Sequence, residues 1–160
     1  MRGRILVAQQ DGVYLMKFIG DVRLTLCATV DSFLDTLFRD PIFKSVLVDV
    51  SEAEGIDSTS LGILAKLSIQ AQQRFDFLPT LVSTNTDITR VLQTMGFDDV
   101  FNIVEHPIEK AEELGELPDK VASQDEIRRR VLEAHRALMS LNEDNRAAFQ
   151  DLVESLEAAS

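Results

Sequence analysis

Apolar residues in the N-terminal part of the chain follow two spacings, one typical of strands and one typical of helices. Short runs rich in β-branched residues predict strands, and apolar residues that recur every three or four positions predict helices. The predicted strands are Ile5–Ala8, Val13–Ile19, Ser45–Val50, Thr80–Ser83 and Val100–Val104. The predicted helices span residues 28–39, 58–75 and 86–95, followed by a short helix from Pro107 to about Leu114. Because helices and strands alternate after an initial strand pair, we expect an α/β protein with a mixed sheet.

Polar residues and glycines mark where several of these elements begin and end. Asp11-Gly12 predicts a hairpin turn between the first two strands, and Gly20-Asp21 predicts the end of the second. Residues 51–57 are rich in acidic side chains and predict a loop after the third strand. Thr86 and Asp87 are the predicted capping residues of the third helix.

The chain from residue 123 onward predicts a pair of amphipathic helices. Ser123 and Glu126 have the spacing of a capping box at the start of the first helix. Two apolar stripes follow, one made of Ile127, Val131, Ala134, Leu138 and Leu141 and the other of Phe149, Leu152, Val153 and Leu156. The polar segment 142–145 separates the stripes. Because neither helix is long enough to be stable alone, we expect the stripes to pack on each other, on the rest of the chain or on a partner.

The net charge narrows the classes of partner. The 160 residues include 16 basic and 27 acidic side chains, which gives a net charge of −11. The longest basic run is Arg128-Arg129-Arg130, so we expect neither nucleic acid nor an anionic membrane as a partner. No apolar run has the length of a signal peptide or of a membrane span. Together these features predict a cytoplasmic protein.

No pattern in the sequence predicts enzymatic chemistry. Neither His106 nor His135 has a nucleophile motif beside it, and His135 is predicted to lie partly covered on a helix surface. The glycines form no phosphate-binding loop, and Cys27 is predicted to be a small buried residue. Asp49 ends a strand as a receiver-domain phospho-aspartate would, but the acidic pair and the lysine of such a site are missing. We therefore expect no catalytic residue, no metal site and no cofactor.

The segment Asp57-Ser-Thr-Ser-Leu-Gly62 places three hydroxyl groups at the start of a predicted helix. Unpaired backbone N–H groups and the positive end of the helix dipole accommodate negative charge at such a position. A phosphate on Ser58 would add about −1.5 to −2 charges, close to Glu52, Glu54 and Asp57. The residues alone leave two interpretations open. Either the hydroxyl groups only cap the helix, or one of them is a reversible phosphorylation site that controls binding.

At these residues the chain resembles the STAS-domain anti-sigma factor antagonists. That family has a strand of the form L-x-D-h-S (h apolar), a short loop, and D-S-[S/T]-G-[L/I]-G at the start of a helix. The present chain has Leu47-Val-Asp-Val-Ser51 and then Asp57-Ser-Thr-Ser-Leu-Gly62. The similarity extends to Phe18-Ile-Gly20 and Gly96-Phe97. The overall length of the chain and its predicted C-terminal helices are most similar to those of the HsbA-type antagonists.

The resemblance covers the chain as far as residue 114 and implies a fold and a domain organisation. The implied fold is the STAS fold, an α/β fold in which helices pack mainly on one face of a mixed sheet. We expect a STAS domain at residues 1–114, a linker at 115–122 and a C-terminal helical hairpin at 123–160. The hairpin either stabilises the domain or offers a surface for a second protein partner.

The resemblance also implies a function in partner switching. An antagonist of this family binds an anti-sigma factor when unphosphorylated and thereby frees a sigma factor. A serine kinase with the histidine-kinase-like fold phosphorylates the antagonist, and a metal-dependent serine phosphatase reverses the modification. The family's phospho-acceptor corresponds to Ser58, and the partner-binding residues correspond to Asp57, Ser58, Thr59, Ser60, Leu61 and Gly62. The subgroup implies control of motility or biofilm formation. The alternative function is a STAS-type scaffold or sensor that binds a ligand or protein without serine phosphorylation.

One position departs from the family pattern. Ser60 stands where the family has glycine, so it adds bulk and a third hydroxyl group to the motif. Thr59 and Ser60 are therefore further candidate phospho-acceptors, although the motif match places the acceptor at Ser58.

Overall fold

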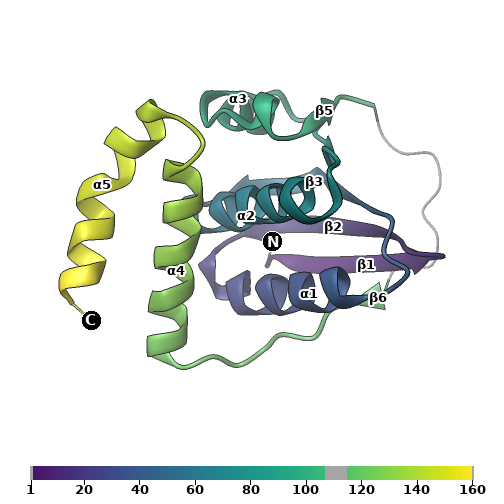
Figure 1. Ribbon diagram of the computed structural model, residues 1–160, viewed down its shortest axis with the longest axis horizontal. Coiled ribbons are helices and arrows are strands. Elements are labelled where there is room, and N and C mark those ends of the chain that lie inside the picture. The colour runs from purple at the N-terminus through teal and green to yellow at the C-terminus, as the bar shows by residue number, and fades with distance from the viewer. Residues whose placement is uncertain (1, 107–114, 160) are drawn as a thin grey trace.

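The computed structural model describes residues 2–106 and 115–159, and in them one mixed sheet forms the centre of the molecule (Figure 1). The strand order is β5-β4-β3-β2-β1-β6. The strands are β1 (Arg4–Gln10), β2 (Val13–Val22), β3 (Ser45–Ile56), β4 (Thr80–Val82), β5 (Asn102–Val104) and β6 (Gly115–Glu116). β1 is antiparallel to β2 and to β6, whereas the pairs β2–β3, β3–β4 and β4–β5 are parallel. The predicted mixed sheet is confirmed.

Figure 1 shows α1 and α2 side by side in front of the sheet, and α4 across one end of both. The helices are α1 (Cys27–Arg39), α2 (Ser58–Phe75), α3 (Thr86–Thr94), α4 (Gln124–Met139) and α5 (Glu143–Ala158), with short 3-10 helices η1 (Leu24–Leu26) and η2 (Phe97–Asp99). α5 packs on α4, on the side away from the sheet. The predicted C-terminal helical pair is therefore present, and its first helix packs on the α/β part of the chain.

The second and third strands are longer than predicted. β2 continues through Gly20 to Val22, and β3 continues through residues 51–56, which were predicted to form a loop. The two extensions pair with each other across register shifts between Lys17 and Ile19 and between Gly20 and Asp21. Gly20 has a φ of 77°, which glycine adopts without steric cost, so the strand bends there without ending.

Three further boundaries differ from the predictions or extend them. The cap of α3 is Asn85, whose side chain accepts hydrogen bonds from the backbone of Asp87 and Ile88, so the prediction of Thr86 and Asp87 as caps was wrong. β5 begins at Asn102 because η2 ends at Asp99 and the backbone N–H groups of Val100 and Phe101 both donate to the carbonyl oxygen of Phe97 in the turn that follows. β6 lies within the predicted linker and pairs with β1. The predicted helix 107–114 lies outside the described residues.

The core lies between the sheet and the α1–α2 layer. β3 contributes Val46, Val48 and Val50, each at most 2% exposed, and these side chains form one buried cluster with apolar residues of both helices. Cys27 belongs to the same cluster, as predicted, and its burial raises the pKa of its thiol. No helix within residues 2–106 and 115–159 is long and apolar enough to cross a membrane.

Tyr14 and Asp40 form a hydrogen-bonded pair at the edge of this core. The Tyr14 hydroxyl donates to Asp40 Oδ2 over 2.5 Å, and Asp40 Oδ1 accepts from the backbone N–H of Ile42 over 3.0 Å. Burial, together with the hydrogen bond to Asp40 and its negative charge, raises the pKa of Tyr14 to about 12. The same hydrogen bond lowers the pKa of Asp40.

We expect Tyr14 to titrate with a midpoint near 12 in the folded protein. The pKa of tyrosine in unfolded chains is about 10. The stabilisation from this raised pKa is therefore complete below pH ~10 and is lost as the pH rises through the folded value. The chain has one tyrosine and no tryptophan, so tyrosinate absorbance reports Tyr14 alone. Asp40→Asn should lower the midpoint only in part, because burial is the largest cause. A midpoint near the unfolded value in protein that circular dichroism shows to be folded would contradict the assignment.

Candidate functional site

α2 begins at Ser58, directly after its capping residue Asp57. Asp57 Oδ1 accepts a hydrogen bond from the backbone N–H of Ser60 over 2.8 Å, which satisfies one of the unpaired donors of the first turn. Asp57 Oδ2 accepts from the backbone N–H of Leu24 over 2.7 Å. Both carboxylate oxygens are therefore engaged, and Asp57 fixes η1 against the start of α2.

The three hydroxyl groups of this first turn differ in accessibility. Thr59 is 4% exposed and Ser60 is 7% exposed, so both face the interior. Ser58 is half-buried, which leaves it the most accessible of the three. Of the three hydroxyl groups, that of Ser58 therefore belongs to the residue that a protein from outside reaches most easily.

The Ser58 hydroxyl contacts a histidine from the C-terminal helices. Ser58 Oγ lies 2.9 Å from His135 Nε2, and His135 Nδ1 lies 2.7 Å from the carbonyl oxygen of Val131. A carbonyl cannot donate, so Nδ1 carries the proton, and in the neutral imidazole Nε2 accepts the hydrogen bond from Ser58. His135 is 1% exposed and packs against the ring of Phe149. The prediction of a partly covered surface histidine was therefore wrong, and substrates cannot reach its imidazole in this arrangement.

Gly62 allows α4 to approach α2 closely, one turn after Ser58. A Cβ atom at Gly62 would lie 2.2 Å from the carbonyl oxygen of Ala134 and 2.7 Å from its Cβ. The last glycine of the motif thus serves a helix–helix contact within the chain. Leu61, beside it, is 2% exposed and belongs to the core. The predicted partner-binding residues therefore lie together at the start of α2, and most of them are buried in this structure.

An ion cluster between α1, α2 and α4 lies next to this contact. Asp31 is 4% exposed, and its carboxylate pairs with Lys66 over 2.9 Å and with Arg130. Lys66 also lies 3.4 Å from Glu133. Burial disfavours the charged ammonium, but the hydrogen bond to Asp31, the charge of Asp31 and the contact with Glu133 outweigh it and raise the pKa of Lys66. Three helices are thus joined through one buried carboxylate.

Sequence reasoning missed both His135 and Asp31, although each left a signal. Asp31 shares a helix face with Leu34, three positions on, and His135 shares a face with Leu138. A charged or polar residue on an apolar face indicates a buried partner. What the sequence lacks is the identity of that partner, because Ser58 and His135 are 77 positions apart.

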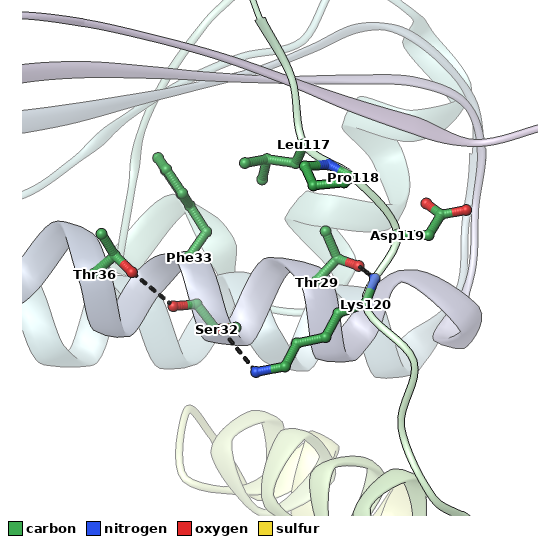
Figure 2. Close-up of a pocket in the computed structure, with 8 residues that line it drawn as sticks. All are labelled: Thr29, Ser32, Phe33, Thr36, Leu117, Pro118, Asp119 and Lys120. Atoms are coloured by element: carbon green, nitrogen blue, oxygen red, sulfur yellow. Dashed lines mark hydrogen bonds between the residues drawn. The ribbon is translucent and has the colours of Figure 1, made fainter.

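A separate groove lies between α1 and the segment that leads to α4 (Figure 2). Its volume is about 440 Å³, and its lining residues are Thr29, Ser32, Phe33, Thr36, Leu117, Pro118, Asp119 and Lys120. The backbone N–H of Lys120 donates to Thr29 Oγ1 and its ammonium donates to Ser32 Oγ, so these polar groups satisfy one another. Within the described part of the chain, no three acidic, histidine or cysteine side chains gather as a metal site would require.

The comparisons with known proteins assign the fold. The model of the STAS-domain family matches residues 4–112, which is more than half of the chain. No curated protein matches the chain. STAS domains are typical of anti-sigma factor antagonists, commonly bind anti-sigma factors in partner switching, and are generally regulators rather than enzymes. With its matched α/β part, its mixed sheet and its helix at Ser58, this chain belongs to the STAS-domain family.

Proposed function

We propose that this protein is an anti-sigma factor antagonist whose binding is controlled by phosphorylation of Ser58. The observation that carries the proposal is the position of Ser58 at the first residue of α2, directly after the capping Asp57 and more exposed than Thr59 and Ser60. The unphosphorylated protein binds an anti-sigma factor through the start of α2. The finer assignment, to the HsbA-type antagonists and to control of motility or biofilm formation, rests on the sequence resemblance.

The chemistry of the proposed switch is a phosphoryl transfer from ATP to Ser58 Oγ, with ADP as the leaving group and loss of the hydroxyl proton. A serine kinase of the histidine-kinase-like fold supplies the catalytic residues, and a metal-dependent phosphatase hydrolyses the product. The start of a helix tolerates the new charge, because its N–H groups and dipole stabilise anions. The helix therefore persists while the surface that it presents gains about −1.5 to −2 charges.

We expect Ser58→Asp to weaken binding to the anti-sigma factor at least tenfold, whereas Ser58→Ala retains it. The aspartate adds a negative charge where the partner docks, and alanine adds none. Binding is measured by isothermal titration against each anti-sigma factor encoded by the host genome. Thr84→Asp is a matched control, because Thr84 is exposed between β4 and α3, outside α4, and the substitution changes the charge equally.

The same variants locate the phosphate. Protein purified from the cells that naturally produce it, in the presence of phosphatase inhibitors, should have phosphate on Ser58 by mass spectrometry and none in the Ser58→Ala variant. Phosphate on Thr59 or Ser60 instead of Ser58 would identify that residue as the phosphorylation site that controls binding. Equal affinities of the Ser58→Asp and Ser58→Ala variants, with no phosphate found, would instead support a STAS scaffold that acts without phosphorylation.

A further inference from the structure

α4 covers the part of the molecule that the proposed function requires to be accessible. Three residues of α4 contact three features of the α/β part: Arg130 pairs with Asp31, Ala134 lies against Gly62, and His135 contacts Ser58. Asp31 is in α1, whereas Ser58 and Gly62 are in α2, so α4 crosses the N-terminal halves of both helices. A partner cannot reach Gly62 or Asp31 while α4 occupies this position.

The features under α4 form a site suited to a helix. Gly62 offers bare backbone against which a second helix can pack at close range. Asp31 offers a buried carboxylate that requires a cation, and Ser58 offers a hydroxyl group. A helix that fits this site carries a small residue opposite Gly62 and a basic residue one turn earlier, as Ala134 and Arg130 do in α4.

The α4 contact is imperfectly satisfied. Among the described residues, Nε of Arg130 is a buried nitrogen without a hydrogen-bond partner. Leaving a buried donor unpaired works against docking of α4. Water can satisfy this donor once α4 moves away.

We propose that the surface formed by Asp31, Ser58, Gly62 and Lys66 is a docking site for a helix of the anti-sigma factor, which binds by taking the place of α4. This inference rests on the proposed function, because it assigns the partner's binding element and the state of the chain that receives it. With α4 docked, the protein is closed to the partner and Ser58 is hydrogen-bonded to His135. With α4 released, the same surface is open to the partner helix and Ser58 is open to the kinase.

The test releases α4 by substitutions within α4 itself, so that the sequences of α1 and α2 stay unchanged. The full-length variant Arg130→Glu/Ala134→Leu places a carboxylate against Asp31 and a large side chain against Gly62. We expect faster hydrogen exchange in α4 and retained protection in β2 and β3. Arg129→Glu is the matched control, since it makes the same charge change on the exposed side of α4. If hydrogen exchange shows that the double variant also loses protection in β2 and β3, the single variant Arg130→Glu is used in its place.

The probe is a fluorescent peptide with the sequence of residues 123–141. We expect it to bind the opened variant at least tenfold more tightly than the wild type or the Arg129→Glu control. A peptide with Arg130→Glu and Ala134→Leu should not bind. Two outcomes would overturn the inference. One is continued hydrogen-exchange protection of α4 in both the Arg130→Glu/Ala134→Leu variant and the Arg130→Glu variant. The other is failure of the wild-type peptide to bind a variant in which α4 is released.

Binding of the anti-sigma factor separates this inference from the proposed function. We expect the opened variant to bind it at least tenfold more tightly than the wild type. Equal affinities with α4 released would contradict replacement of α4 while leaving the proposed function in place. Binding of the peptide without binding of any anti-sigma factor would support the helix-docking surface and contradict the proposed function.

Discussion

Asp31→Ala should lower the free energy of unfolding by about 3 kcal/mol, the lower end of the range for breaking a buried ion pair. The side chain of Asp31 is 6% exposed, and its carboxylate balances the charges of Lys66 and Arg130. Their side chains are 26% and 15% exposed, so water screens them only in part once the carboxylate is gone. Because Arg130 belongs to α4, the same substitution should also loosen α4 and increase its hydrogen exchange.

Urea denaturation measures this loss, and Asp35→Ala is the matched control. Asp35 is on the same helix but exposed, so its removal should change the free energy of unfolding by less than about 0.5 kcal/mol. The pH dependence gives a second readout. The raised pKa of Lys66 stabilises the fold below the pKa of an unfolded lysine, and this contribution is lost as the pH rises through the higher folded value. Asp31→Ala should reduce that alkaline loss. An Asp31→Ala variant as stable as the control would show that the cluster contributes no net stability.

The α/β part of the chain could be predicted because its signals are local. The helix from Ser58 to Phe75 was predicted with the bounds that the structure has, since a capping residue precedes an apolar repeat. The extension of β3 was missed because its acidic residues suggested a loop. Glu52 and Glu54 are exposed whereas Ala53 between them is buried, which is the alternation of a strand with one face in solvent.

The packing of α4 over the candidate site could not be predicted, because it depends on contacts between segments that are far apart in the sequence. The apolar stripe that includes Ala134 and Leu138 predicts that α4 packs on something, but a stripe does not identify its partner. Complementary shape identifies α2 as a packing partner of α4, because Gly62 has no Cβ atom at the point where the backbone of Ala134 approaches. Complementary charge, between Asp31 and Arg130, identifies α1 as a second partner. A single glycine or a single aspartate is compatible with many partners along the chain, so only the fold reveals each pair.

Gly62→Ala should destabilise the protein by about 2 kcal/mol, the middle of the range for overpacking a core. In a helix with open surroundings the same change would stabilise by about 1 kcal/mol, because alanine has the higher helix propensity. The contact with α4 reverses the sign, since the new Cβ would lie 2.2 Å from the carbonyl oxygen of Ala134 and 2.4 Å from its carbonyl carbon. Backbone atoms cannot rotate away as a side chain can, so α4 has to shift or leave.

The sign of the Gly62→Ala effect therefore reports whether α4 is docked. In the wild-type background we expect a lower free energy of unfolding and faster hydrogen exchange in α4. In the Arg130→Glu/Ala134→Leu background, where α4 is already released, the clash is absent and only the gain in helix propensity of about 1 kcal/mol remains. Urea denaturation of the four proteins gives both values, and their difference is the coupling between residue 62 and α4. Gly115→Ala is the control, because among the described residues beyond its chain neighbours the nearest atom to its Cβ would be 4.0 Å away. Equal effects of Gly62→Ala in both backgrounds would show that the glycine is not what admits α4.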